Sequence, residues 1–223
     1  QGYGMSEVSS AASCCCNGNF KSLSVGYPLL TTTIGIFAPG TTDELDYGEE
    51  GEICISGPSI MLGYLNNKAE TDNVIHRHPD GTLWVHSGDI GHMDSDGFVY
   101  IKGRIKRMIT LFNGHKIFPT HIESVLGHHP LVESCAVVGV NDTTHAQGQL
   151  TLAVIEAKEQ TLEKLTAMKN ELYEMCRQEL EGPAKPYDII FIESMPHTGM
   201  GKIDYLKLAE NYNNENKNKT EAV

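Results

Sequence analysis

The chain has 223 residues, which is long enough for one large or two small domains with a sizeable buried core, and we expect two. Its formal net charge is −12 at pH 7 and no run of Lys or Arg is dense, which argues against nucleic acid as a partner. No stretch approaches the roughly 18 apolar residues of a membrane helix. No secretory signal peptide is evident, so we expect no integral membrane segment and a cytoplasmic location.

Between residues 23 and 102 the pattern is typical of strands, because short apolar runs are broken by Gly and Pro. The expected strands lie in SVGYPLL, TTTIGIFA, GEICISG and the hairpin GHMDSDGFVYIKG, which turns at Asp96-Gly97. One helix is expected at about residues 67–76.

After Arg104 helices and strands alternate, which predicts a second, smaller α/β unit. We expect a hairpin in MITLFNGHKIF, a helix from Pro119, strands in SCAVVGV and LTLAVIEA, a helix over 161–180, a strand in DIIFIE and a short helix from Asp204. The 161–180 helix is indicated by apolar residues at helical spacing, and Gly182-Pro183 ends it.

The change of pattern places a domain boundary near Gly103 to Arg107, giving domains over residues 1–104 and 105–223. The polar run 211–223 has the composition of a disordered natural terminus. Gln1 is not an initiator Met, so we expect the chain to begin within a longer protein. The six cysteines match neither a metal-site spacing nor a disulfide framework and are expected to be reduced thiols.

The segment QGYGMSE, residues 1–7, is too glycine-rich and polar for a core strand. Its side chains suit a nucleotide, because Tyr3 could stack on a base, Ser6 could donate to a phosphate and Glu7 could ligate a metal. A tight surface turn is the alternative.

Two further segments carry groups that suit a ribose. HSGDIG places Asp89 between glycines, where a short carboxylate can accept both ribose hydroxyls, although a turn aspartate bonded to its own backbone is an alternative. GRIKRMI places the Arg104 guanidinium beside a glycine, where it suits a ribose hydroxyl or a phosphate oxygen. A solvated charged linker is the alternative there.

The segment PHTGMGKI, residues 196–203, surrounds Lys202 with two glycines and a proline. Glycines let the backbone approach a ligand closely, and a lysine there can neutralise charge on a carboxylate and a phosphate together. An exposed lysine in a turn is the alternative.

These segments, with GEICISGPSIMLGYLN and FNGHKIFPTHIESVL, occur in an order that resembles the adenylate-forming superfamily. This superfamily includes acyl-CoA synthetases, firefly luciferase and peptide-synthetase adenylation domains. The resemblance covers nearly the whole chain. It implies an α/β (α+β) fold, in which the strand-rich, barrel-like end of a large AMP-binding domain precedes a small mobile α/β domain.

The resemblance also implies roles for single residues. Tyr3, Ser6, Asp89 and Arg104 would bind the nucleotide, and Glu7 would hold Mg²⁺. Lys202 would be catalytic. Lys106 would be the hinge about which the small domain swings, and backbone around Gly114 would line the channel for CoA.

The sequence departs from the family pattern at several positions. Ser6 stands where Thr is usual, which keeps the hydroxyl donor. His121 stands where an acid is common, and Tyr205 follows Lys202 where a basic residue is frequent. The Ser/Thr/Gly-rich loop that cradles the β- and γ-phosphates is absent from these 223 residues, so we expect an upstream part of the large domain to supply it and this fragment alone to be inactive.

The resemblance implies an enzyme that uses ATP, Mg²⁺ and CoA to convert a carboxylic acid into acyl-CoA, AMP and pyrophosphate. Lys106 at the hinge favours an acyl- or aryl-CoA ligase, since peptide-synthetase modules usually have aspartate there. One alternative is an adenylation enzyme that loads a carrier-protein thiol. Another is a non-catalytic fragment with only folding or interaction functions.

Overall fold

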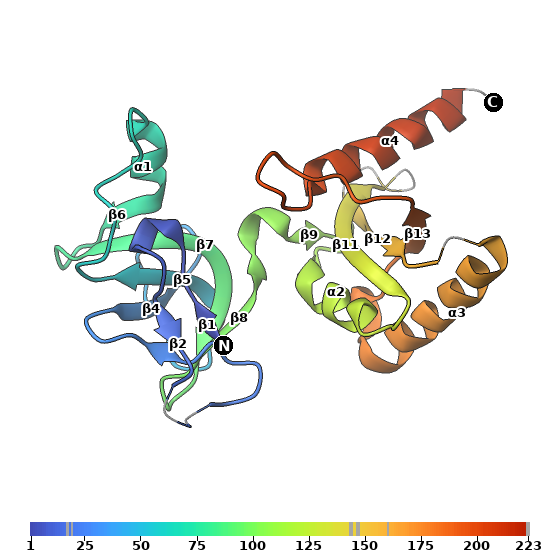
Figure 1. Ribbon diagram of the computed structural model, residues 1–223. Helices are drawn as coiled ribbons and strands as arrows, with labels where there is room; N and C mark the ends of the chain where they lie inside the picture. The colour runs from blue at the N-terminus through green and yellow to red at the C-terminus, as the bar shows by residue number, and fades with distance from the viewer. Residues whose placement is uncertain (17, 19, 143–144, 146–147, 160, 222–223) are drawn as a thin grey trace. The chain divides into compact units, whose positions relative to one another are not determined.

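The protein divides into two compact units, Gln1–Lys106 and Arg107–Val223 (Figure 1). The computed structural model describes residues 1–16, 18, 20–142, 145, 148–159 and 161–221. The division lies inside the range predicted for the boundary, Gly103 to Arg107, and two residues beyond the Arg104 end chosen for the first domain.

The first unit is strand-rich, as predicted. A small antiparallel sheet contains β1 (Gly2–Tyr3), β2 (Ser13–Cys14) and β3 (Tyr27–Pro28). A larger antiparallel sheet has the order β4-β5-β7-β6, with β8 also paired to β7. Its strands are β4 (Thr33–Phe37), β5 (Gly51–Ser56), β6 (Ile75–Arg77), β7 (Leu83–Met93) and β8 (Val99–Arg104).

The predicted helix over 67–76 is shorter than expected. It is α1 (Lys68–Val74), and Asn67 caps its N-terminus because the Asn67 side chain accepts the Glu70 backbone N–H. Ile75 instead pairs with Val85 in β6, because the apolar strand β7 offers it a ladder partner. Tertiary pairing therefore overrides the helical pattern at this end.

The second unit contains the predicted hairpin, formed by β9 (Ile109–Thr110) and β10 (Lys116–Ile117), and a three-stranded sheet. The 3₁₀ helix η2 (Ile105–Arg107) leads into it. In the sheet β11 (Val132–Asn141) pairs antiparallel with β12 (Gln149–Ala157), which pairs parallel with β13 (Asp188–Ile192).

Helices cover both faces of this sheet (Figure 1). Val137 packs into a core shared with α2 (Pro119–Gly127) and α3 (Leu162–Glu179). Its neighbours in β11, Ala136 and Val138, pack into a second core with Leu208 of α4 (Tyr205–Glu221). Burial on both faces explains why the strand reads as a continuous apolar run.

The helix α4 continues to Glu221, through most of the polar run 211–223 for which the sequence predicts disorder. Tyr212 packs against the α4 side of the sheet, and the Asn213 side chain accepts the Asn141 backbone N–H at 3.0 Å. These contacts, and a run without Gly or Pro, allow the helix to continue through a polar sequence. Residues 222 and 223 lie outside the described residues.

Arg107 anchors the start of the second unit. Its guanidinium donates to Glu123 of α2 and lies 3.6 Å from the centre of the Tyr205 ring. The same Glu123 oxygen accepts the Val137 backbone N–H at 2.8 Å. The carboxylate therefore joins α2, the sheet and the residue next to the domain boundary.

Glu123→Ala is expected to lower the free energy of unfolding by about 2 kcal/mol, because it leaves a largely buried guanidinium and a strand N–H without their acceptor. Urea unfolding measures this change. Glu163→Ala, which removes an exposed carboxylate from the first turn of α3, is the matched control and should change stability by less than about 0.5 kcal/mol. Equal losses in the two variants would contradict the assigned role of Glu123.

Candidate functional site

The first unit brings three of the predicted nucleotide-binding residues together. Asp89 lies in β7 and its side chain is only 6% exposed. The Tyr3 hydroxyl donates to Asp89 Oδ2 at 2.7 Å, and Arg104 Nε lies 3.0 Å from Asp89 Oδ1. Burial, and then the neighbouring Asp89 carboxylate, raise the pKa of Tyr3, so the phenol stays protonated and donates. Residues distant in sequence thus form one polar cluster.

A bulge in β7 aims Asp89. Against β5, Glu52 pairs with Ile90 while Cys54 pairs with His86, so residues 87–89 of β7 lie opposite the single residue Ile53. Bulges of this kind re-aim side chains. Gly88 has φ 72°, which side chains other than glycine rarely adopt.

The Ser87 hydroxyl fixes this bulge from both sides. It donates to the Ile53 carbonyl at 2.6 Å and accepts the Asp89 backbone N–H at 3.0 Å. The segment HSGDIG therefore lies at an interruption within the long strand β7.

Glu7 and Ser6 lie in the short 3₁₀ helix η1 (Ser6–Val8). Glu7 Oε1 accepts the Tyr64 hydroxyl at 2.6 Å, and this hydrogen bond, followed by burial, raises the pKa of Tyr64 to about 12. Ser6 is exposed. The segment turns sharply: a side chain at Gly4 would place its Cβ 1.7 Å from the Ser10 carbonyl oxygen.

The Glu7 carboxylate has the chemistry that Mg²⁺ requires. Magnesium prefers oxygen ligands and usually takes one or two protein carboxylates with water and phosphate. Within the described residues only Oε1 of Glu7 has a hydrogen-bond partner, Tyr64, which leaves Oε2 available as a ligand. Tyr64 is a residue that sequence reasoning missed, although it lies in the family segment GEICISGPSIMLGYLN.

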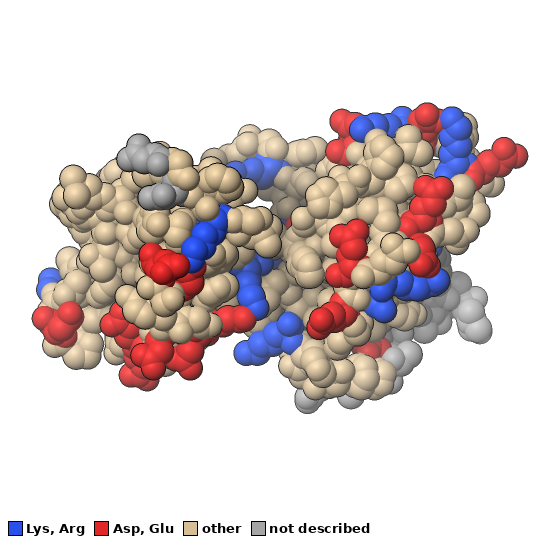
Figure 2. Space-filling model, turned by 90° about the horizontal axis from the view of Figure 1, so that it is seen from below, with Lys and Arg blue, Asp and Glu red and all other residues tan. Residues whose placement is uncertain are grey.

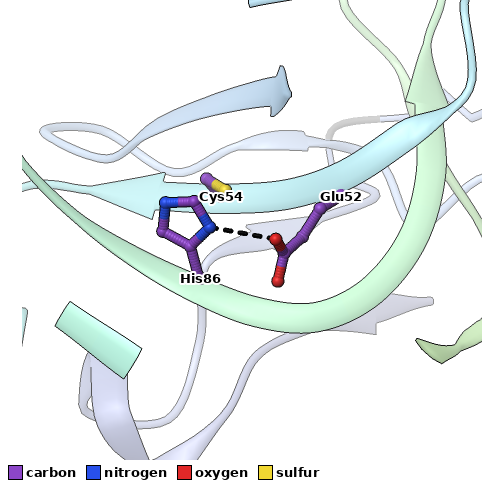
Figure 3. A group of neighbouring side chains, drawn as sticks. All are labelled: Glu52, Cys54 and His86. Carbon is purple, nitrogen blue, oxygen red and sulfur yellow. Dashed lines mark hydrogen bonds and ion pairs between the residues drawn. The ribbon is translucent and has the colours of Figure 1, made fainter. Parts of the chain in front are cut away.

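A second buried cluster contains Glu52, Cys54 and His86, whose donor atoms lie within 4.8 Å of one another (Figure 3). Such a set could suit a metal, but both oxygens of Glu52 already accept N–H groups, from Gly88 and from His86. Burial, and then Glu52, raise the pKa of the Cys54 thiol, so it stays protonated. The Glu52 oxygens are thus occupied by hydrogen bonds and the Cys54 thiol is protonated, so no metal is assigned here.

The second unit presents Lys202 on a tight hairpin. Thr198 N–H donates to the Lys202 carbonyl at 2.7 Å, and Gly201 N–H donates to the Thr198 carbonyl at 2.9 Å. Gly201 has φ 77°, so the turn requires its glycine. Lys202 is exposed, and in the described part of the chain its side chain forms no ion pair. The ammonium is therefore free to meet a ligand.

The remaining predicted residues are also exposed. Lys106 lies in η2 at the end of the first unit. Gly114, with φ 81°, forms the turn between β9 and β10, where its N–H donates to the Leu111 carbonyl at 2.9 Å. His121 is exposed in the first turn of α2. The hinge and channel roles stay predictions.

Among the described residues on the face drawn in Figure 2, Lys and Arg side chains lie interspersed with Asp and Glu. In the part of the chain that the structure describes, no helix has the length and apolar character needed to cross a membrane.

Comparison with known proteins places these observations in a family. The AMP-binding enzyme family matches residues 1–65, and the AMP-binding enzyme C-terminal domain matches residues 121–202. The chain belongs to the adenylate-forming superfamily. The C-terminal match ends at Lys202, and the first match contains Tyr3, Ser6, Glu7 and Tyr64.

Relatives of this superfamily member are named as CoA ligases. The chain is 36% identical over 205 residues to a probable 4-coumarate–CoA ligase 1 of Dictyostelium discoideum, covering 91% of this chain and 35% of that protein. It is 34% identical over 204 residues to a long-chain-fatty-acid–CoA ligase of Salmonella typhimurium, covering 91% and 34%. The chain thus spans about a third of the length of these relatives.

Solved structures of the superfamily have the same fold. One is the o-succinylbenzoate CoA synthetase of Bacillus subtilis in complex with its acyl-adenylate intermediate, with a TM-score of 0.78 and 27% identity over 93% of this chain and 40% of that one. Another is an ATP-bound enzyme from Rhodopseudomonas palustris, with a TM-score of 0.78 and 26% identity over 95% and 40%. The predicted α/β fold and superfamily are confirmed.

Proposed function

We propose that this chain is the C-terminal portion of an ATP-dependent acyl-CoA synthetase. The complete enzyme activates a carboxylic acid as an acyl-adenylate and transfers the acyl group to CoA, giving acyl-CoA, AMP and pyrophosphate. The observation that carries this proposal is the convergence of Tyr3, Asp89 and Arg104, three residues with a family role in nucleotide binding. Its relatives' names as CoA ligases support the choice of acceptor.

In this proposal the Asp89 cluster receives the ribose of ATP. A carboxylate is acceptor-only, so its two oxygens suit the two ribose hydroxyls. Tyr3 and Arg104 supply the donors that hold the Asp89 carboxylate in place until the ribose arrives. The Tyr3 ring lies beside the adenine, and the Ser6 hydroxyl donates to phosphate.

Glu7 would hold Mg²⁺, which when bound offsets the negative charge of the phosphates. The Tyr64 hydroxyl fixes the Glu7 carboxylate by donating to Oε1 at 2.6 Å, so Oε2 is the atom that would face the metal. Tyr64 is thereby a supporting residue for this site.

Lys202 acts in the first step. A substrate carboxylate oxygen attacks the α-phosphorus of ATP, the bond to the pyrophosphate oxygen breaks, and the Lys202 ammonium offsets charge on the carboxylate and the α-phosphate. In the second step the CoA thiol attacks the acyl carbonyl and AMP leaves. The second unit turns about Lys106 between the steps, which withdraws Lys202 and brings the Gly114 turn to the pantetheine channel.

Two other functions compete with this one. A carrier-protein thiol could replace CoA as acceptor, or the chain could have no catalytic role. Measurement of ATP–pyrophosphate exchange on the complete protein with a panel of carboxylic acids, followed by CoA consumption, separates the three. Exchange with CoA consumption is expected, exchange without it indicates a carrier protein, and no exchange with any acid indicates a non-catalytic role.

The 223-residue chain by itself is expected to show negligible exchange, because it lacks the phosphate-binding loop that holds pyrophosphate as it leaves. The same assay on the isolated chain and on the complete protein measures the difference. Comparable exchange by both would contradict the proposed division of the site.

A further inference from the structure

Glu52 is a buried carboxylate that the proposed reaction does not use. It lies in β5, and its side chain is 7% exposed. Burying a carboxylate costs several kcal/mol unless donors compensate. The donors that compensate for the burial of the Glu52 carboxylate therefore indicate its role.

Two N–H groups of the Asp89 strand meet this carboxylate, and Figure 3 shows the contact from His86. Gly88 N–H donates to Glu52 Oε1 at 2.9 Å, and His86 Nδ1 lies 2.9 Å from Glu52 Oε2. Burial by itself raises the pKa of Glu52, but the hydrogen bonds from His86 and Gly88 outweigh it and leave the pKa below its usual value. The carboxylate is therefore ionised and accepts from both groups.

Gly88 is the centre of the bulge that aims Asp89. Since β5 pairs with β7 at His86 and again at Ile90, the residues between them are outside the regular ladder. Glu52 thus replaces a strand carbonyl as the acceptor for the Gly88 N–H. Asp89 follows Gly88 directly, so the position of the Gly88 peptide sets the direction of the Asp89 side chain.

His86 is in turn fixed by its surroundings. An ionised Glu52 is acceptor-only, so His86 Nδ1 carries the proton that it donates. Its other nitrogen, Nε2, lies 3.1 Å from His78 Nε2, and the His78 ring packs edge-on against Phe37 with centroids 4.7 Å apart. The 4% exposed His86 side chain therefore holds Glu52 in one orientation.

We propose that Glu52 and His86 are positioning residues for nucleotide binding, which hold the Gly88 peptide so that Asp89 points at the ribose hydroxyls. This inference rests on the proposed function, in which Asp89 binds the ribose. Neither residue touches the nucleotide, so their effect passes entirely through Asp89.

The test measures binding of AMP and of 2′,3′-dideoxy-AMP to the complete protein. Glu52→Gln keeps the shape but places an amide NH₂ where one carboxylate oxygen accepts an N–H. It should weaken AMP binding by roughly tenfold, which is the effect of losing one hydrogen bond to a charged group. Binding of the dideoxy analogue should stay within about twofold of its value in the wild type. In an Asp89→Asn background the same change should have no further effect.

Matched variants separate positioning from a general loss of structure. Glu50→Gln removes the same charge from an exposed residue just before β5, where it pairs with Lys102, and should leave AMP binding unchanged. His86→Asn keeps an N–H donor near Glu52 and should bind AMP as the wild type does. His86→Leu removes that donor and should lower the affinity for AMP by about tenfold. This pair decides the question if Glu52→Gln does not fold.

Each result has a distinct meaning. If the wild type prefers AMP to the dideoxy analogue and Glu52→Gln abolishes that preference, the positioning role stands. If Glu52→Gln weakens the binding of both ligands equally, or weakens the binding of neither ligand, the positioning role is overturned and the ribose role of Asp89 remains. If the wild type shows no preference, the ribose role fails and the positioning role fails with it.

Discussion

Lys202→Ala is expected to reduce ATP–pyrophosphate exchange by the complete protein by about 10²–10³-fold, the range found when one preorganised stabilising group is removed from a reaction centre. Thioester formation from a supplied acyl-adenylate should remain largely intact, because in the proposed reaction the turn of the second unit withdraws Lys202 before this step. Exchange of labelled pyrophosphate measures the first step, and release of AMP with CoA measures the second.

The structure supplies a reason to expect this variant to fold. Lys202 is exposed on a hairpin whose hydrogen bonds use its backbone, and no described residue forms an ion pair with its side chain. Its thermal unfolding midpoint should therefore match that of the wild type. Lys207→Ala, at an exposed position in the first turn of α4, is the control and should leave both steps unchanged. Equal losses in the two steps for Lys202→Ala would contradict the proposed division of labour.

The sequence was sufficient for the elements whose pattern is local. The helix α3 was predicted from apolar spacing alone, and Met168, Leu172 and Cys176 are its buried residues. The strand β11 was predicted from an apolar run, and both of its faces are buried. In both elements the buried residues are apolar residues of the local pattern.

Contacts between segments that are distant in the sequence could not be predicted from local patterns. Ile75 reads as the end of a helix but pairs with Val85. The polar segment 211–221 continues α4, and Tyr212 and Asn213 within it contact the sheet. No local pattern contains these partners. The change in pattern after Arg104, where the strand-rich region ends, predicts a division of the chain there, and the two compact units divide after Lys106.

Some residues of the candidate site could likewise be predicted from the sequence, and others could not. Tyr3, Asp89 and Arg104 were identified from family segments, and their side chains meet. Glu52 and Tyr64 were not identified, although both lie in a segment that carries the resemblance. Their roles depend on partners 36 and 57 residues away, Gly88 and Glu7, and on a register shift in β7 that local residue preferences do not encode.

Lys106→Pro is expected to lower thioester formation by about 10²-fold, the size of effect that misplacement of a reacting group by about 1 Å produces, while adenylation falls much less. Proline fixes φ near −65° and removes the backbone N–H, so a residue that must rotate between two poses loses that freedom. Lys106 lies in η2 at the end of the first unit and is exposed, which makes a backbone effect separable from a packing effect.

The control for this hinge prediction is Lys106→Ala, which removes the same ammonium and leaves the backbone free to turn. It should retain more thioester formation than Lys106→Pro, because the hinge role assigns the larger part of the effect to the backbone. Single-turnover measurement of acyl-adenylate formation and of its transfer to CoA gives the two rates in one experiment. A proline variant that loses adenylation more than thioester formation would place the pivot at a different residue.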